Sequence, residues 1–288
     1  MTGMINRLSK LYKQKGLKAC IKKGVRWFGR RKTIVWVWNT LPFVFLVNLT
    51  RGKVLYRKEN YWVLYDIYGS NTFYFPKIEY WTSDTTRSRK KKRYYKSNNI
   101  SIEEGDVVVD VGAYFGITSI VAADDAKIVY AIEPSPRNLR YLRKNTKKYD
   151  NIVVLPCAAW KENGKIEINI GSHPSEDSLI VPDDGNSNES KSVKAKTIES
   201  IVQENKMESI DFLKVEAEGV EPEVLRGIGK VSVHKVACTG DAERYGKTTH
   251  DEVNLILRKK GYKTYKNLED SFKMVYGIKK SQDNKLDS

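Results

Sequence analysis

Cysteine is scarce in this chain of 288 residues, and the three that occur, Cys20, Cys157 and Cys238, show no CxxC spacing. An odd number without that spacing disfavours a disulfide framework and a zinc site, and it favours a reducing compartment. Because no Cys/His ligand set exists, we predict no bound metal, although neighbouring carboxylates leave Mg²⁺ open.

Acidic residues are missing from the beginning of the chain. Between Met1 and Lys58 there are 15 Lys and Arg residues and no Asp or Glu, and the net charge of the whole chain is +16. A second basic run, RSRKKKRYYK, covers residues 87–96. Basic surfaces attract nucleic acid, anionic lipid or acidic substrates, and a solvated basic face is the plainer alternative.

Residues 1–50 are predicted to be a basic, partly helical N-terminal extension. Apolar residues recur at helical spacing over residues 5–28 with Lys and Arg opposite, a pattern typical of a helix lying on anionic lipid. A helix packed on the main domain is the alternative. The apolar run Thr33–Leu49 has 17 residues and contains Asn39 and Pro42, whereas a bilayer span needs about 20 apolar residues. We expect it to form a hydrophobic hairpin at the membrane surface or to be buried against the main domain.

The rest of the chain changes pattern at residue 101. Residues 51–100 alternate aromatic and polar side chains at period two, which predicts a short strand-rich region. Over residues 101–280, strand and helix patterns alternate and end in an antiparallel tail. They predict one α/β domain with a Rossmann-like, doubly wound, mostly parallel sheet. Residues 171–192 are rich in Ser, Asp, Asn, Gly and Pro and are expected to be a long mobile loop, as lids often are. Residues 281–288 are expected to be a tail.

The first strand of this domain runs into a glycine-bearing loop. The continuous apolar run Val107–Val111 is typical of a strand buried on both faces. Gly112 and Gly116 allow the backbone to approach a ligand closely before a helix begins. The spacing Asp110-x-Gly112-x-x-x-Gly116 lacks the third glycine of the dinucleotide fingerprint. An acid at the strand end fits instead a ligand that carries a cationic amine and no phosphate, such as S-adenosylmethionine.

A carboxylate follows the second predicted strand, Ile128–Ile132. Glu133 comes 21 positions after Gly112, near the roughly 20 expected for the acid that accepts both ribose hydroxyl protons. An acid that merely precedes a helix is the alternative. We therefore predict that Glu133 and the adjoining Pro134 bind the cofactor. Ala158, near the end of the third predicted strand, should lie along the same edge beside the adenine.

Three segments together resemble the FkbM-type methyltransferase family: DVVVDVGAYFGITS, VYAIEPSPRNLRYLRKN and DFLKVEAEGVEPEVLRG. The resemblance covers about residues 101–265. It implies a class I methyltransferase fold, S-adenosylmethionine as cofactor, and methylation of hydroxyl groups, often on sugars or natural products. The family usually has Asn where this chain has Tyr114, which we count among the cofactor-binding residues. Its signature has Asp at the strand end where this chain has Glu216.

Four glutamates follow the predicted strand Ile210–Val215. Glu216 ends that strand at the carboxyl edge, where ligands of open α/β sheets bind, so it is the first candidate for a catalytic base or acceptor positioner. Glu218 is the second candidate. Glu221 is the third, because it matches the last acid of the family signature. Glu223 suits the first turn of a helix, where acids complement the helix dipole.

These features predict an S-adenosylmethionine-dependent O-methyltransferase that acts on a hydroxyl-bearing small molecule, a glycan or a lipid-linked saccharide. We expect it in the cytoplasm, peripherally at the inner face of the cell membrane, with residues 1–50 on anionic lipid. An RNA methyltransferase is one alternative, but the Asn/Asp-Pro-Pro-aromatic strand end usual for base amino groups is missing, which disfavours nucleic acid. A non-catalytic membrane-associated module on a degenerate Rossmann fold is the other, motivated by Tyr114 and Glu216.

Overall fold

The computed structural model describes residues 34–36, 45–48, 53–58, 61–66, 71–76, 100–171, 174, 177–180, 189–240, 244, 248–267 and 274–279. The predicted helix at residues 5–28, the basic run at 87–96 and the tail at 281–288 lie outside these residues. The chain divides into two compact units, Met1–Tyr80 and Trp81–Ser288, which are described separately.

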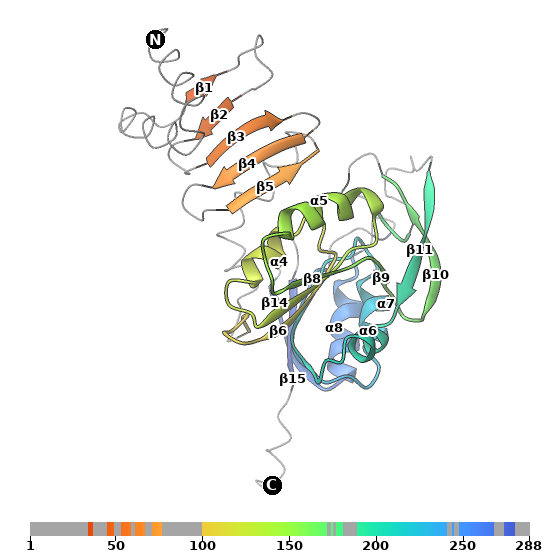
Figure 1. Ribbon diagram of the computed structural model, residues 1–288. Coiled ribbons are helices and arrows are strands. Elements are labelled where there is room, and N and C mark those ends of the chain that lie inside the picture. Colours follow the sequence, from red (N-terminus) through yellow and green to blue (C-terminus); the bar gives the residue numbers. More distant parts are fainter. Residues whose placement is uncertain are drawn as a thin grey trace, which may run out of the picture. The chain divides into compact units, whose positions relative to one another are not determined.

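The first unit contains a five-stranded antiparallel sheet (Figure 1). In order across the sheet, its strands are β1 (Ile34–Trp36), β2 (Phe45–Asn48), β3 (Lys53–Lys58), β4 (Tyr61–Asp66) and β5 (Asn71–Phe75). The apolar run Thr33–Leu49 supplies β1 and β2, which pair with Ile34 opposite Val47. The run thus forms the first two strands of this sheet, and its expected place at the membrane surface or against the main domain stays a prediction. Among the described residues, no helix is both long enough and apolar enough to cross a membrane.

A seven-stranded sheet forms the centre of the second unit (Figure 1). In order across the sheet, its strands are β14 (Tyr262–Asn267), β15 (Met274–Lys279), β13 (Val233–Cys238), β12 (Ile210–Val215), β6 (Val107–Val111), β7 (Ile128–Ile132) and β8 (Ile152–Leu155). The strands from β13 to β8 are parallel, and β14 and β15 extend the sheet in antiparallel fashion. The predicted Rossmann-like, mostly parallel sheet is therefore confirmed, including its antiparallel tail.

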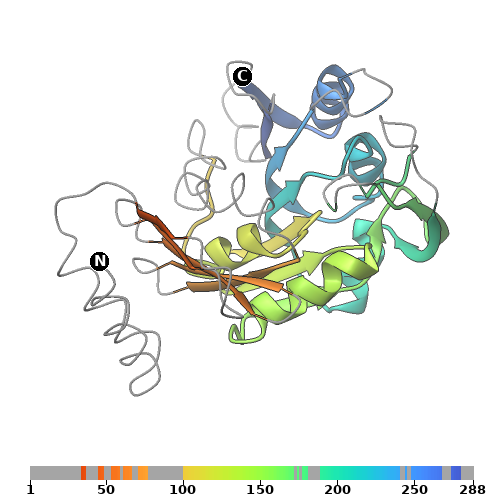
Figure 2. The same ribbon diagram turned by 90° about the horizontal axis from the view of Figure 1, so that it is seen from above.

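Helices cover both faces of this sheet (Figure 2). On one side lie α4 (Ile117–Ala122) and α5 (Pro136–Thr146), and on the other α6 (Ile198–Glu204), α7 (Glu221–Arg226) and α8 (His250–Lys259). Successive residues of one strand point to opposite faces, so Val108 packs with Ala122 of α4 while Val109 joins the cluster that includes Ile201 of α6 and Leu257 of α8. Two-sided burial explains why the central strands are continuous apolar runs rather than alternating ones.

A smaller sheet corrects two expectations. It has the order β10 (Gly164–Asn169), β11 (Ser190–Lys196) and β9 (Ala158–Ala159). The third predicted strand is in fact divided, because β8 ends at Leu155 while Ala158 pairs with Ala195 of β11. The predicted loop at 171–192 is shorter than expected, because its end belongs to β11, which pairs antiparallel with β10.

The order of the main sheet reverses between β6 and β12. From β6 the chain proceeds outward through β7 to β8, and it then returns to β12 on the other side of β6. Such a switch point creates a crevice at the carboxyl ends of the strands, where open α/β sheets bind ligands. The register places Asp110 opposite Lys214 and Val111 opposite Val215, so the loops after β6 and β12 leave the sheet side by side.

Candidate active site

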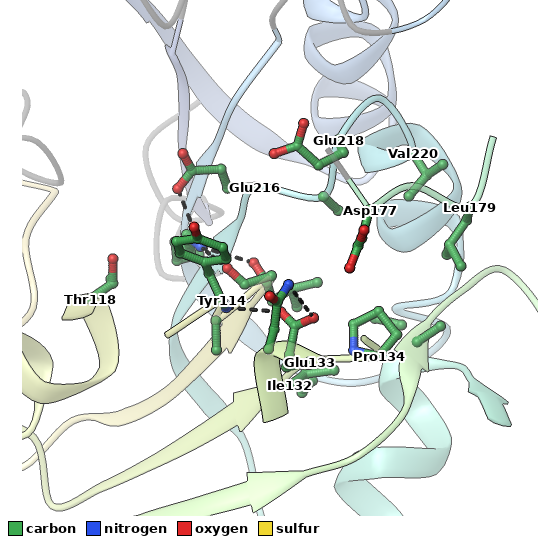
Figure 3. A pocket seen from close by; sticks show the side chains of 18 of the residues that line it. Tyr114, Thr118, Ile132, Glu133, Pro134, Asp177, Leu179, Glu216, Glu218 and Val220 are labelled. Atoms are coloured by element: carbon green, nitrogen blue, oxygen red, sulfur yellow. Dashed lines mark hydrogen bonds and ion pairs between the residues drawn. The ribbon is translucent and has the colours of Figure 1, made fainter. Parts of the chain in front are cut away.

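A pocket lies at this carboxyl edge, with about 910 Å³ of empty space including its open mouth (Figure 3). Its walls are the loop after β6, the start of the loop after β7, strand β9, the turn after β12 and part of residues 174–179. Among the predicted site residues, those in the lining are Gly112, Tyr114, Glu133, Pro134, Ala158, Glu216 and Glu218. Asp110, Gly116 and Glu221 do not line the pocket, although each is next in sequence to a residue that does.

The two glycines of the loop after β6 are required by contacts within the protein. Gly112 has a φ of +73°, and a Cβ there would lie 1.7 Å from the carbonyl oxygen of Glu216. Gly116, with a φ of +83°, precedes α4, and a Cβ there would lie 2.6 Å from Cδ1 of Leu142 in α5. Gly112 therefore lets the two central loops touch, while Gly116 lets α5 pack against the start of α4.

Glu133 is buried at the end of β7 and is held by three donors. Its Oε2 accepts the backbone N–H of Tyr114 at 2.8 Å, and its Oε1 accepts the N–H of Ser135 at 2.9 Å. The amide of Asn138 adds a longer contact to Oε1 at 3.4 Å. Burial raises the pKa of Glu133 to about 7 even though these donors oppose the rise, and the negative charge of Asp177 adds to it.

Asp110 lies below the pocket and has a protein cation as its partner. Its Oδ1 lies 2.9 Å from Nζ of Lys214, and its Oδ2 accepts the hydroxyl of Ser119 at 2.6 Å. The cation that we expected a ligand to supply at this strand end is therefore Lys214. Burial alone would lower the pKa of Lys214, but the charges of Asp110 and Glu216 outweigh it and raise that pKa. The strand IDFLKV also contains Asp211, so no local sequence signal distinguishes Lys214 from an ordinary polar residue of a strand.

The turn after β12 brings Glu216 and Glu218 to the same side of the pocket (Figure 3). The side chain of Glu216 is 31% exposed, and its Oε2 lies 3.3 Å from Nζ of Lys214. Glu218 has a φ of +52°, a left-handed conformation that is uncommon outside glycine. The two first candidates for a reaction carboxylate thus lie at the pocket, as the strand-end argument predicted.

Glu221 is buried beneath this turn and organises it. Its Oε1 accepts the backbone N–H groups of Ala217 at 2.9 Å and Gly219 at 3.3 Å, together with the hydroxyl of Thr239 at 3.3 Å. Its Oε2 accepts the hydroxyl of Thr249 at 3.3 Å. Burial raises the pKa of Glu221 against these hydrogen bonds. The structure therefore places Glu221 behind Glu216 and Glu218 rather than beside them.

Asp177 is a pocket residue that the sequence argument did not identify. Its side chain is 2% exposed and forms an ion pair with Arg137, while its Oδ2 accepts the hydroxyl of Ser135 at 2.5 Å. Nearby, the hydroxyl of Ser178 donates to the carbonyl oxygen of Glu218 at 3.0 Å. Residues 177–180, which we call the strap, are thus tied both to the start of α5 and to the turn after β12.

Residues 110–264 match the family model described as the Methyltransferase FkbM domain. The match covers more than half of the chain. The chain belongs to the FkbM methyltransferase family. The resemblance seen in the three motifs is thereby confirmed, and with it the class I methyltransferase fold and S-adenosylmethionine as the cofactor of the family. No curated protein matches the chain.

Several solved methyltransferase structures are similar to this member of the FkbM family. An FkbM methyltransferase from Methylobacillus flagellatus KT is 19% identical with a TM-score of 0.45, over 64% of this chain and 46% of that chain. A fibrillarin from Aeropyrum pernix with bound S-adenosyl-L-methionine is 13% identical with a TM-score of 0.44, over 77% and 95%. TrmK from M. capricolum with S-adenosyl-homocysteine is 12% identical with a TM-score of 0.42, over 68% of each. The matched part of this chain thus spans just under half the length of the FkbM structure.

Proposed function

We propose that this chain is an S-adenosylmethionine-dependent O-methyltransferase that acts on a hydroxyl of a glycan or lipid-linked saccharide at the membrane surface. The observation that carries the proposal is the composition of one pocket in an FkbM domain. Glu133 with Pro134 lines it after β7, and Glu216 with Glu218 lines it after β12. One carboxylate is thus available for cofactor hydroxyls and two for an acceptor.

The residues around Glu133 fit the adenosine part of the cofactor. An ionised carboxylate has about four acceptor positions, and the backbone N–H groups of Tyr114 and Ser135 occupy one on each oxygen. Oε2 therefore keeps an acceptor position for one ribose hydroxyl, and Oε1 offers a second if the hydroxyl displaces the long 3.4 Å contact from Asn138. Pro134 and Ala158 add small apolar surfaces to the lining, which suit the faces of an adenine ring.

The residues after β12 suit the acceptor hydroxyl. When bound, S-adenosylmethionine supplies an electrophilic methyl group on a sulfonium. Glu216 or Glu218 would accept the hydroxyl proton as the oxygen forms its bond to the methyl carbon, while the electron pair of the broken bond stays on sulfur. The pocket walls would hold the reacting groups in line and exclude water, which is the main contribution that a protein makes to such a displacement.

The class of acceptor and the location are supported by charge. The carboxylates of Glu216 and Glu218 at the pocket favour a hydroxyl-rich, uncharged acceptor over a phosphate, because like charges repel each other. The acid-free basic sequence of residues 1–58 and the apolar run at 33–49 support contact with anionic lipid. Together these features favour an acceptor that is presented at a membrane.

The test follows a labelled methyl group. The full chain would be incubated with S-adenosyl-[methyl-³H]methionine and with glycan, lipid, RNA and protein fractions from a strain that lacks the gene. We expect label in the glycan or glycolipid fraction with the parent protein and little label with Glu216→Gln. Label in RNA would favour the nucleic-acid alternative. Failure to bind S-adenosylhomocysteine in calorimetry would contradict the enzyme itself. Removal of residues 1–50, followed by vesicle flotation, tests the location separately.

A further inference from the structure

Lys214 is a fully buried charge between the two central loops of the site. Its side chain is 2% exposed, and its strand neighbours Leu213 and Val215 are buried and apolar. The ammonium lies within hydrogen-bond or ion-pair distance of four oxygens: Asp110 Oδ1 at 2.9 Å, Gly112 O at 2.9 Å, Val111 O at 3.1 Å and Glu216 Oε2 at 3.3 Å. A buried ammonium is stable only with such a complete set of partners.

The partners of Lys214 divide into two groups. Asp110 is itself fixed by Ser119 of α4, and its Cα faces that of Lys214 across the two strands, so this pair anchors the ammonium to the sheet. Val111 and Gly112 direct their carbonyl oxygens at the same ammonium from the loop after β6. The ammonium thus donates hydrogen bonds to the two carbonyls, and the carboxylates of Asp110 and Glu216 balance its charge as ion-pair partners.

The loop after β6 also contacts the backbone of Glu216 directly. The N–H of Glu216 donates to the carbonyl oxygen of Val111 at 3.2 Å, which is the same oxygen that accepts from Lys214. Gly112 lies so close to the carbonyl of Glu216 that no side chain fits between them. The main chain of Glu216 is thus fixed by the loop, and its carboxylate is drawn toward the ammonium.

We propose that Lys214 is a positioning residue for methyl transfer, which holds the carboxylate of Glu216 in a fixed relation to the loop Val111–Gly112. The inference rests on the proposed function, because it assumes that Glu216 acts on the acceptor. A purely structural Lys214–Asp110 pair is the competing explanation. The two differ in one respect: the effect of Lys214 on the reaction runs through Glu216 only if Lys214 positions it.

A double-mutant cycle tests this difference. Initial rates of labelled methyl transfer to the glycan or glycolipid fraction would be compared for four proteins. These are the parent protein, Lys214→Met, Glu216→Gln and the double variant. We expect each single variant to be slower by about 100-fold, since a misplacement of about 1 Å has that effect. The double variant should be within about threefold of Glu216→Gln, because residues that act as a unit are not additive. Multiplying losses would overturn the proposal.

A second measurement does not depend on activity. In protein labelled with ¹⁵N-lysine, the buried ammonium of Lys214 should give a slowly exchanging signal, assigned by its loss in Lys214→Met. Glu216→Gln should move this signal, and the control Glu218→Gln should not. If the chemical shift of the Lys214 ammonium is the same in Glu216→Gln as in the parent protein, the proposal is overturned. If the parent transfers no methyl group, the proposed function fails while this measurement still decides whether Lys214 holds Glu216.

Folding of the variants is checked by thermal melting. Lys214→Met leaves Asp110 buried without its cation, which is strongly destabilising. If Lys214→Met does not fold, the double variant Asp110→Asn/Lys214→Met, which lacks both charges, replaces it. The cycle then uses Asp110→Asn in place of the parent protein as its reference. Non-additivity with Glu216→Gln is again the expected result, and additivity again contradicts the positioning role.

Discussion

The backbone N–H of Tyr114 donates to Oε2 of Glu133 across 2.8 Å, so the loop after β6 and the acid after β7 are directly joined. Tyr114 has a φ of +53°, in the left-handed region where Asn is among the favoured residues outside glycine. This conformation gives a physical reason for the Asn that the family usually has there. Tyr114 instead stacks on Phe115, with ring centroids 3.7 Å apart. The departure from the family pattern is therefore compatible with the same hydrogen bond.

The raised pKa of Glu133 predicts how stability depends on pH. The ordinary pKa of this carboxyl is 4.5, and burial in the folded protein raises its pKa to about 7. Between these values the unfolded state releases the proton and the folded state keeps it, so the free energy of unfolding falls as pH rises. The total loss is about 3 kcal/mol, since one pKa unit corresponds to about 1.4 kcal/mol. Urea denaturation between pH 4.5 and 8 measures this loss of unfolding free energy. The variant Glu133→Gln should lack this part of the pH dependence.

Cofactor binding should depend on pH in the opposite sense. Ribose hydroxyls donate to the ionised carboxylate of Glu133, so below pH 7 binding must first release its proton. The affinity for S-adenosylhomocysteine should therefore fall by up to about tenfold per pH unit below 7 and level off above it. Calorimetry in two buffers of different ionisation enthalpy measures the released proton. An affinity that stays constant from pH 5.5 to 8 would contradict the ribose role of Glu133.

Gly112→Ala should damage both the fold and the pocket. A Cβ at this position meets the carbonyl of Glu216 at 1.7 Å, so the loop or the turn must move. Gly105 provides a matched control, because its φ of +87° is similar but nothing lies within 4 Å of a Cβ built there. Gly105→Ala should show only the conformational penalty, on the order of 1–2 kcal/mol. We expect Gly112→Ala to lose at least about 2 kcal/mol more and to abolish binding of S-adenosylhomocysteine. Equal losses in the two variants would show that the contact is unimportant.

The fold could be predicted because its signals are local. The strand Val107–Val111 appears in the structure with the predicted bounds, because a valine-rich run that ends at a glycine favours a buried strand followed by a turn. The same holds for Ile128–Ile132 and Ile210–Val215, which are followed by Glu133 and Glu216. Each acid ends a parallel strand, and parallel strands deliver their ends to one edge. Sequence alone therefore placed both acids at one site.

The remaining features depend on tertiary contacts that no local pattern records. Lys214 resembles any polar residue in a strand until the register sets it opposite Asp110. Asp177 is one of several acids in a polar segment, and its burial, its ion pair with Arg137 and its hydrogen bond from Ser135 become evident only in the structure. Glu221 matches the last acid of the family signature, but it is held beneath the turn and does not line the pocket. These roles follow from burial and hydrogen bonding in three dimensions.

Arg137→Met should loosen the strap over the pocket. Arg137 forms an ion pair with the buried Asp177 and donates to the carbonyl of Gly171 at 2.9 Å. Without it, Asp177 keeps the hydroxyl of Ser135 and the N–H of Gly171 but loses its cation. We expect S-adenosylhomocysteine to dissociate about tenfold faster in stopped-flow measurements, in line with a charged hydrogen bond of about 1.5 kcal/mol. Arg143→Met, which changes an exposed arginine of the same helix, should leave the rate unaltered.

Glu221 offers a test that separates an architectural carboxylate from a catalytic one. In Glu221→Gln the amide oxygen can still accept from Ala217 and Gly219, and the new amide can donate to Thr249, whose hydroxyl can turn. Because burial raises the pKa of Glu221, a neutral side chain should be tolerated, with methyl transfer within about threefold of the parent. Glu221→Ala leaves the buried N–H groups without an acceptor and should cost at least about 2 kcal/mol of unfolding free energy. If Glu221→Gln melts like the parent and binds S-adenosylhomocysteine but transfers no methyl group, Glu221 is the base, as the family signature suggested.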